Sequence, residues 1–239
     1  MIIFAHIFAG ALLGLGFWHL TNDRRALPLC ITASILPDLI DKSLGLAFPL
    51  VLGGGRTVFH SLLVVGVVLL LCLLLFMRSR FVLLGVGVAG AILLHQIFDE
   101  MWKLPANWFY PLLGPFQGQM IPEYIGIYIW LEITDPSEWM FMIATVAILF
   151  ESYRDRIPIS RGSLPSWPDT LRTNVYTLVV VVLLCMGLYL VTTGLTSATD
   201  TFIAPSYYQI PNVMAGLLAL CGAVIMRWET FDTPRWAGP

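Results

Sequence analysis

"VYTLVVVVLLCMGLYLVTTGL", residues 175–195, decides the fold class of this chain. A helix needs about 20 mostly apolar residues to cross a bilayer. This run has that length and contains no charged side chain. Similar apolar runs recur along the sequence, so we expect an all-α, polytopic transmembrane helix bundle.

The composition supports a membrane protein. The chain has 239 residues, of which 58% are hydrophobic and 12% are charged, and its mean hydropathy is +0.82. Soluble domains carry about 25% charged residues, so this deficit makes membrane lipids the expected surroundings. No basic cluster suggests nucleic acid as a partner. The four cysteines are scattered and form neither a metal-type spacing nor a disulfide framework.

Seven stretches are candidate membrane helices. They are residues 2–20, 27–40, 61–77, 81–98, 139–150, 175–195 and 211–228. The second and fifth are the weakest, and Pro37 interrupts the second, so we expect six to seven membrane helices. The first stretch has a histidine in its apolar run and no basic residue before it, which favours a retained helix over a signal peptide.

We expect a single integral membrane domain over residues 1–239. Residues 1–115 carry the polar motifs, residues 116–137 form an interfacial or re-entrant segment, and residues 138–239 supply the C-terminal helices. The stretch from 99 to 137 holds eight aromatic residues. Because Trp and Tyr favour the headgroup level of a bilayer, we expect this stretch to lie against the membrane.

Basic residues are divided unevenly between the two sides of the predicted bundle. If the turn after the first helix is cytoplasmic, ten fall on the cytoplasmic side and three on the other. The ten are Arg24, Arg25, Arg78, Arg80, Arg154, Arg156, Arg161, Arg172, Arg227 and Arg235, and the three are Lys42, Arg56 and Lys103. Cytoplasmic loops carry the excess of Lys and Arg. We therefore expect a multi-pass protein of the cell membrane with its N-terminus outside and its C-terminus cytoplasmic.

In this orientation, six ionisable side chains lie at the outer ends of the first four helices. They are His6, Asp38, Asp41, His60, His95 and Asp99. Such groups are costly near lipid unless they compensate one another. Imidazole and carboxylate are ordinary ligands of divalent cations, so the six predict a metal site. Three imidazoles favour zinc, with manganese or iron as alternatives.

Each of these side chains also has an ordinary structural interpretation. A buried histidine can bond to a carbonyl, an aspartate can cap a helix, and a His–Asp pair can form without a metal. The shared depth of all six favours the metal site. His19 lies at the other end of the first predicted helix, beside Trp18, and we expect it to be an interface residue.

Four short stretches, in this order, resemble the family of membrane-bound metal-dependent hydrolases, which are small integral membrane proteins of bacteria and archaea. They are "SILPDLIDKSLG" (34–45), "GRTVFHSLL" (55–63), "LLHQIFDEMW" (93–102) and "WFYPLLG" (108–114). The resemblance covers residues 1 to about 115 and implies hydrolysis, although a family name does not identify a substrate.

The family pattern maps onto this chain residue by residue. The early histidine, the Leu-Pro-Asp motif with its second aspartate, the Arg with a following His-Ser, and the His with an Asp four residues on all have counterparts. These are His6, Asp38, Asp41, Arg56, His60, Ser61, His95 and Asp99. Many members carry a further histidine where this chain has Gly55, and Asp-x-Asp-His where it has Asp38, Asp41 and Lys42. These departures bear on the number of metal ions.

A hydrolase of this kind would use the metal to activate water for attack on an ester or phosphoester. The expected ligands are His6, Asp38, His60, His95 and Asp99, while Asp41 either binds the metal or supports a ligand. Arg56 and Lys103 could stabilise charge on the substrate oxygen. Glu100 is a candidate general base.

We expect the reaction to occur at the outer face of the membrane. The aromatic segment beside the site favours a lipid, whose head group could reach the metal while its tails stay in hydrocarbon, and another membrane-associated substrate is the alternative. Two other functions are open. A non-catalytic scaffold stabilised by metal would use the same ligands, whereas a transporter or proton relay would place ionisable groups nearer the bilayer midplane.

Overall fold

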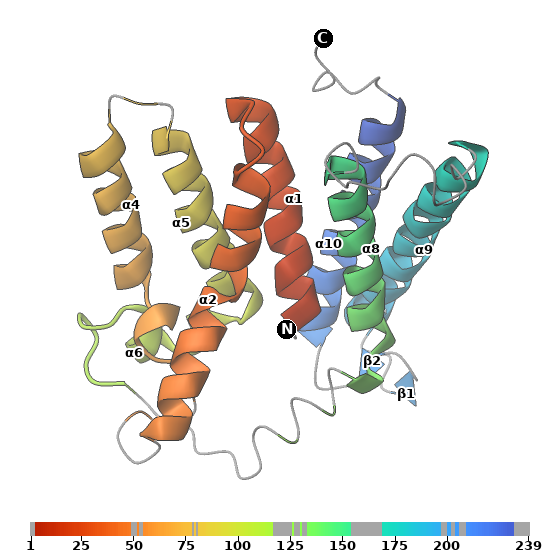
Figure 1. Cartoon of the computed structure of the whole chain (residues 1–239). Coiled ribbons are helices and arrows are strands. Elements are labelled where there is room, and N and C mark those ends of the chain that lie inside the picture. Colours follow the sequence, from red (N-terminus) through yellow and green to blue (C-terminus); the bar gives the residue numbers. More distant parts are fainter. Residues whose placement is uncertain are drawn as a thin grey trace. The chain divides into compact units, whose positions relative to one another are not determined.

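The structure, a computed structural model, divides the chain into two compact units, Met1–Thr134 and Asp135–Pro239 (Figure 1). The residues that the structure describes are 3–48, 52, 55–77, 79, 81–116, 126, 130, 133–153, 169–196, 200–201, 204–205 and 209–231.

The all-α prediction is confirmed, because helices account for nearly all the regular structure in the described residues. Three of these helices are long and apolar enough to cross a membrane, namely Ile3–Thr21, Phe81–Phe98 and Thr170–Thr196. Leu62–Phe76 and Asn212–Trp228 are apolar but shorter. A helix is present at each of the seven predicted stretches.

The first unit is built on four packed helices, α1 (Ile3–Thr21), α2 (Ala26–Ala47), α4 (Leu62–Phe76) and α5 (Phe81–Phe98). Figure 1 shows them as the red, orange and yellow group. Helix α5 contacts each of the other three, so it occupies the middle of the unit. Its end therefore lies within reach of side chains from all of them.

Helices α1 and α2 approach each other closely at Gly10 and Gly14. A Cβ atom on Gly10 would lie 2.4 Å from the Oγ of Ser34, and one on Gly14 would lie 2.7 Å from the Cα of Leu27. Neither distance leaves room for a side chain. Small residues four apart allow such contact between membrane helices, and here the contact holds α1 against the part of α2 that leads to the polar motifs.

Helix α2 continues through Pro37, in contrast to the predicted interruption. It runs from Ala26 to Ala47 with the proline inside it. Pro37 has no N–H to donate to the carbonyl of Ala33, but neighbouring helices can satisfy backbone groups that a proline leaves free. Helix α5 packs against α2 here, and its His95 donates a hydrogen bond to the carbonyl oxygen of Ser34.

Helix α4 is apolar on every side, and the structure buries none of its residues. Leu74 and Leu75 are each about 70% exposed. An apolar helix that packs on its own unit along one side and leaves apolar side chains exposed on the other is typical of a lipid-facing element. The exposure of α4 is therefore consistent with the prediction that residues 61–77 form a membrane helix.

Short elements connect the helices at the polar end of the first unit. They are η1 (Val58–His60) before α4, and η2 (Met101–Lys103) with α6 (Pro105–Trp108) after α5. The predicted interfacial segment 116–137 lies largely outside the described residues. Its neighbour, 101–116, is described and packs on η1 and α5.

The second unit contains α8 (Pro136–Tyr153), α9 (Asp169–Thr196) and α10 (Gln209–Phe231). A two-residue antiparallel pairing between β1 (Asp200–Thr201) and β2 (Ala204–Pro205) lies between α9 and α10. Helices α9 and α10 form the most extensive helix pair of the described chain.

Candidate metal centre

The first unit brings all six predicted ligand residues to one place. His6 lies on α1, Asp38 and Asp41 on α2, His60 on η1, His95 on α5, and Asp99 directly after α5. All six residues are buried, and none is more than 6% exposed. Burial of this many ionisable groups requires close mutual pairing, and their contacts show how it is achieved.

Four of the six present one ligating atom each to a common point. They are Asp38, His60, His95 and Asp99, whose ligating atoms all lie within 4.8 Å of one another. The Nε2 atom of His60 lies 3.5 Å from an oxygen of Asp38 and 3.6 Å from an oxygen of Asp99. Ligands about 2.0–2.1 Å from a zinc ion at tetrahedral angles would be about 3.3 Å apart. The group therefore fits a divalent cation and could hold one.

The two central imidazoles face each other through nitrogen atoms. Nε2 of His95 lies 3.2 Å from Nε2 of His60. Each ring donates its other N–H elsewhere: Nδ1 of His60 to Asp41 (2.8 Å) and Nδ1 of His95 to the carbonyl oxygen of Ser34 (2.7 Å). Two neutral rings so fixed would point two lone pairs at the same point, which only a cation or a proton makes favourable.

Asp41 lies behind His60 and not in the four-residue group. Its carboxylate accepts hydrogen bonds from the ring of His60, from the backbone N–H groups of Thr57 and His60, and from the hydroxyl of Thr57. Carboxylates that bond to the far nitrogen of a metal-binding histidine fix its orientation and increase its basicity. The arrangement corresponds to the supporting role that was one of the two predicted for Asp41.

The carboxylates around His60 make its ring a strong proton acceptor. Burial disfavours the charged ring, but the nearby carboxylates of Asp38, Asp41 and Asp99 outweigh burial and raise the pKa of His60 to about 10. A pocket that holds a proton this firmly is strongly negative. The same field would attract a divalent cation.

Asp99 connects the group to α1 and to the loop before η1. Its Oδ1 accepts a hydrogen bond from Nε2 of His6 (3.1 Å), and its Oδ2 lies 3.2 Å from the guanidinium of Arg56. Burial raises the pKa of Asp99, but the charge of Arg56, aided by His6 and His60, holds it well below the usual range. Asp99 is therefore a carboxylate at neutral pH.

His6 lies beside the four-residue group, against His95. The two ring centroids are 4.1 Å apart. Nδ1 of His6 is buried and has no hydrogen-bond partner among the described residues. His6 therefore does not reach the common point itself. It bonds to Asp99, which does, and so orients that carboxylate.

Asp38 divides its two oxygens between the group and the surface. Oδ2 forms an ion pair with Lys42, four residues on along α2. Oδ1 is buried and accepts no hydrogen bond from the residues described, although the imidazoles of His60 and His95 lie 3.5 and 3.8 Å away. A buried carboxylate oxygen without a donor is well suited to accept a cation.

The predicted catalytic residues are placed differently from one another. Arg56 reaches the group through Asp99, and its side chain is 30% exposed. Glu100 and Lys103 form an ion pair with each other, with 2.7 Å between Oε1 and Nζ. Glu100 also adopts a left-handed backbone conformation (φ 55°) where α5 ends. Glu100 and Lys103 therefore adjoin the centre in sequence, and their side chains contact each other.

Several supporting residues were not predicted. Gln96 is fully buried, donates hydrogen bonds to the carbonyls of Phe59 and Ser61, and accepts one from the indole of Trp108. It thereby holds both residues that flank His60. Asn107 supports the same loop by donating to the carbonyl of Arg56 (2.8 Å). A glutamine inside an apolar helix, directly after a predicted ligand, was the available signal for this role.

Comparison with known proteins places the chain among membrane proteins. None of the curated proteins and none of the solved structures matches it. The family described as YdjM inner membrane protein matches residues 1–198, which include every residue of the centre. The match confirms the predicted membrane location and, at the level of a membrane family, the resemblance seen in the motifs. This chain belongs to the YdjM inner membrane protein family.

Proposed function

We propose that this chain is an integral membrane hydrolase that uses a divalent cation to cleave an ester or phosphoester, with a lipid as the favoured substrate. The observation that carries the proposal is the convergence of Asp38, His60, His95 and Asp99 on one point. A cation held there would polarise the scissile group and lower the pKa of a bound water. Zinc suits two imidazoles and two carboxylates, and manganese and iron are the alternatives.

The remaining residues of the centre would hold the ligands in place. Asp41 keeps the ring of His60 oriented through Nδ1, and the carbonyl of Ser34 does the same for His95. His6 orients Asp99 from the opposite side. Partners of this kind make the site rigid before substrate arrives, which is a requirement for catalysis by a preorganised centre.

Two cations flank the centre and could receive an anionic substrate. Arg56 pairs with Asp99 and Lys42 with Asp38, and each cationic side chain is partly exposed, at 30% and 25%. The carboxylate partners are almost fully buried, so the cations lie on the route from the surface to the ligands. The fork of donors on Arg56 suits a phosphate or a carboxylate. We assign Arg56 to charge stabilisation on the substrate.

Apolar side chains beside the centre support a lipid substrate. Trp102, Phe109, Leu112 and Leu113 are all exposed on the segment that follows α5, and Leu112 is 84% exposed. Trp108 of the same segment bonds to Gln96 of the centre. A lipid could place its head group at Arg56 while its tails contact these side chains. The same side chains would also serve simply to anchor the protein at the interface.

Glu100 and Lys103 are paired with each other and would take secondary roles in the reaction. Glu100 could act as the general base only after it leaves Lys103, with which it is paired. Lys103 is 52% exposed and could meet a substrate head group before Arg56 does. Substitution of each by glutamine would separate these roles, because loss of a base lowers kcat whereas loss of a docking charge raises KM.

The first test is metal content with turnover. Protein purified without chelator should contain a divalent cation by elemental analysis, and the metal-loaded protein should hydrolyse one of a panel of phospholipids, prenyl phosphates and soluble esters. His60→Ala should lose both metal and turnover. Arg56→Gln should keep the metal and lose turnover, whereas Arg25→Gln, which removes an exposed arginine paired with Asp23, should lose neither.

Three outcomes would contradict all or part of the proposal. Full metal occupancy without turnover of any substrate in the panel would favour the metal-stabilised scaffold. Hydrolysis of a soluble ester at a rate independent of bilayer or micelle would support a hydrolase but contradict a lipid substrate. Absence of metal would favour the remaining alternative, in which the buried His and Asp side chains form a proton relay.

A further inference from the structure

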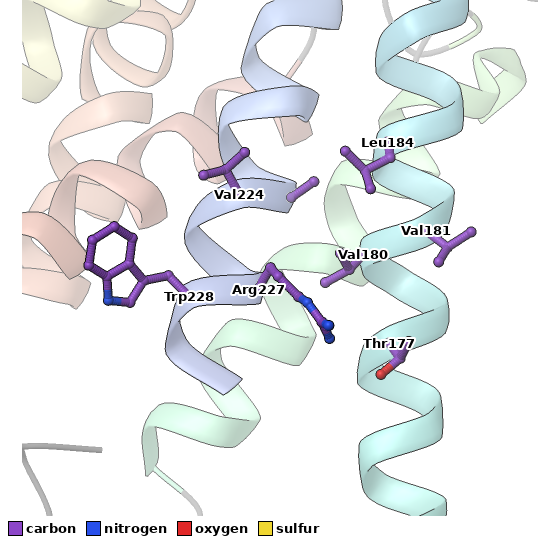
Figure 2. A pocket seen from close by; sticks show the side chains of 8 residues that line it. Thr177, Val180, Val181, Leu184, Val224, Arg227 and Trp228 are labelled. Carbon is purple, nitrogen blue, oxygen red and sulfur yellow. The ribbon is translucent and has the colours of Figure 1, made fainter. Parts of the chain in front are cut away.

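The second unit contains a groove between α9 and α10 that has no part in the metal centre. Its volume is about 700 Å³, within the usual range for small-molecule sites. Its lining residues are Thr177, Val180, Val181 and Leu184 on α9 and Ala223, Val224, Arg227 and Trp228 on α10 (Figure 2). On each helix, these positions share one face.

The groove arises because α9 and α10 touch elsewhere along their length. A Cβ on Gly216 would lie 2.8 Å from the carbonyl oxygen of Gly187, and one on Gly187 would lie 2.8 Å from the side chain of Leu220. The backbones are therefore in near contact at this level. The two glycines lie outside the groove, which opens toward Thr177 and Arg227, where larger side chains replace glycine.

The groove is apolar along its length and polar at one end. Val180 and Ala223 are buried, whereas Val181, Leu184 and Val224 are exposed. Figure 2 shows the side chain of Arg227 extending from α10 toward α9, near Val180 and Thr177. Thr177 adds a hydroxyl at the same end. The ligand that matches this pattern has a long apolar part and an anionic head.

The position of the polar end also matches a lipid. Arg227 and Trp228 close the apolar stretch Asn212–Trp228 of α10. Tryptophan at the end of an apolar helix is typical of the membrane interface, and basic pockets between membrane helices bind anionic head groups. The predicted orientation would place this end on the cytoplasmic side, where anionic lipids are enriched.

We infer that the groove is a binding site for one anionic phospholipid. The acyl chain lies along Val181, Leu184 and Val224, and the phosphate pairs with Arg227. Charge complementarity selects this occupant over a zwitterionic lipid, because a single basic side chain near an anionic lipid surface contributes about a fivefold preference.

The test is native mass spectrometry of the full-length protein in detergent, titrated separately with phosphatidylglycerol and with phosphatidylcholine of the same chain length. The wild type should bind phosphatidylglycerol about fivefold more tightly. Arg227→Gln should abolish the preference and Arg227→Lys should retain it. Arg172→Gln, which removes a cation paired with Glu151 outside the groove, should leave the preference unchanged. Val224→Trp, which fills the groove, should weaken binding of both lipids.

Three results would overturn the inference. The preference could survive in Arg227→Gln, or glycerol phosphate alone could displace the lipid as well as the intact phospholipid does. The Val224→Trp variant could instead change a dimer to a monomer while lipid binding stays the same, which would make a second copy of the chain the occupant. Circular dichroism of each variant verifies that the helices are intact.

Discussion

The polar side chains of the metal centre in the first unit and those of α9 in the second are satisfied in different ways. In the first unit, hydrogen bonds join residues that are far apart in sequence, such as His6 with Asp99 and His95 with the carbonyl of Ser34. In the second unit, the hydroxyls of Thr192 and Thr193 on α9 donate to carbonyls three or four residues back on the same helix.

This difference separates residues that define a site from residues that only fill a helix. A threonine bonded to its own helix is satisfied before any tertiary structure forms. A histidine bonded to another helix is satisfied only when both helices are in place, so it fixes their relative position. The long-range polar bonds of the first unit therefore mark where chemistry can occur.

The largest effect should come from removal of a ligand in the first unit. His60→Ala and Asp99→Ala should each weaken metal binding more than about 100-fold, beyond the loss typical of a supporting residue. His19→Ala and, in the second unit, Thr193→Val should leave metal content unchanged. Elemental analysis of the four variants measures this difference. Full metal content in His60→Ala or in Asp99→Ala would show that these residues do not form the metal centre.

A smaller effect should follow from loss of a carboxylate that supports a ligand. Asp41→Asn should weaken metal binding about 10-fold to 100-fold, because His60 loses the partner that fixes its ring. The matched change in the second unit is Asp135→Asn, since Asp135 accepts hydrogen bonds from Ser137 at the start of α8. That variant should keep its metal affinity, as measured by competition with a chelator. Equal losses in the two variants would end the distinction between the units.

Substitutions that disturb helix packing should lower the stability of the protein without changing its metal content. Gly216→Val places atoms where the carbonyl of Gly187 and the side chain of Val191 already lie, and we expect it to cost about 1–3 kcal/mol. A thermal melt followed by circular dichroism should show the loss, while metal content stays at the wild-type level. Gly66→Val on α4 is the control, because no atom lies within 4 Å of its Cβ position. A metal deficit in Gly216→Val would show that the units are coupled.

The last effect concerns the exchange of a proton for the metal ion. Because the pKa of His60 is raised to about 10, the metal-free centre holds a proton on this ring at neutral pH. Metal binding must displace it, so the affinity should fall about tenfold per pH unit below 10 and one proton should leave per ion. In the metal-free protein, the stabilisation from this proton is complete below about pH 6.5 and is lost as the pH rises through about 10. Calorimetry in two buffers of different ionisation enthalpy measures the release, and an identical heat in both would contradict it.

Much of the first unit could be predicted because its signals are local. Apolar runs located the helices, and the sidedness of Arg and Lys placed His6, Asp38, His60, His95 and Asp99 at one depth. The structure brings those five to one place. The depth of these residues was enough to predict that they meet, because few other side chains lie at the same level as a given helix end.

Which residues bind the metal and which support a ligand could not be predicted, because this depends on which atom of each side chain faces the common point. Asp38 and Asp41 are equivalent in sequence, three residues apart on one helix, yet only Asp38 joins the four-residue group. The continuation of α2 through Pro37 was missed for a similar reason. Its local cost is offset by the packing of α5, which has no signature in the sequence of α2.

Gly55 has a left-handed backbone (φ 73°), and a Cβ on it would lie 3.2 Å from the Cα of Lys42. Positions 42 and 55 are the two at which this chain differs from the motif pattern of metal-dependent membrane hydrolases, and the structure makes them neighbours. A histidine at position 55 would need both a changed backbone and the space beside Lys42. The two positions are therefore spatially coupled, and a side chain added at position 55 must be accommodated by the residue at position 42.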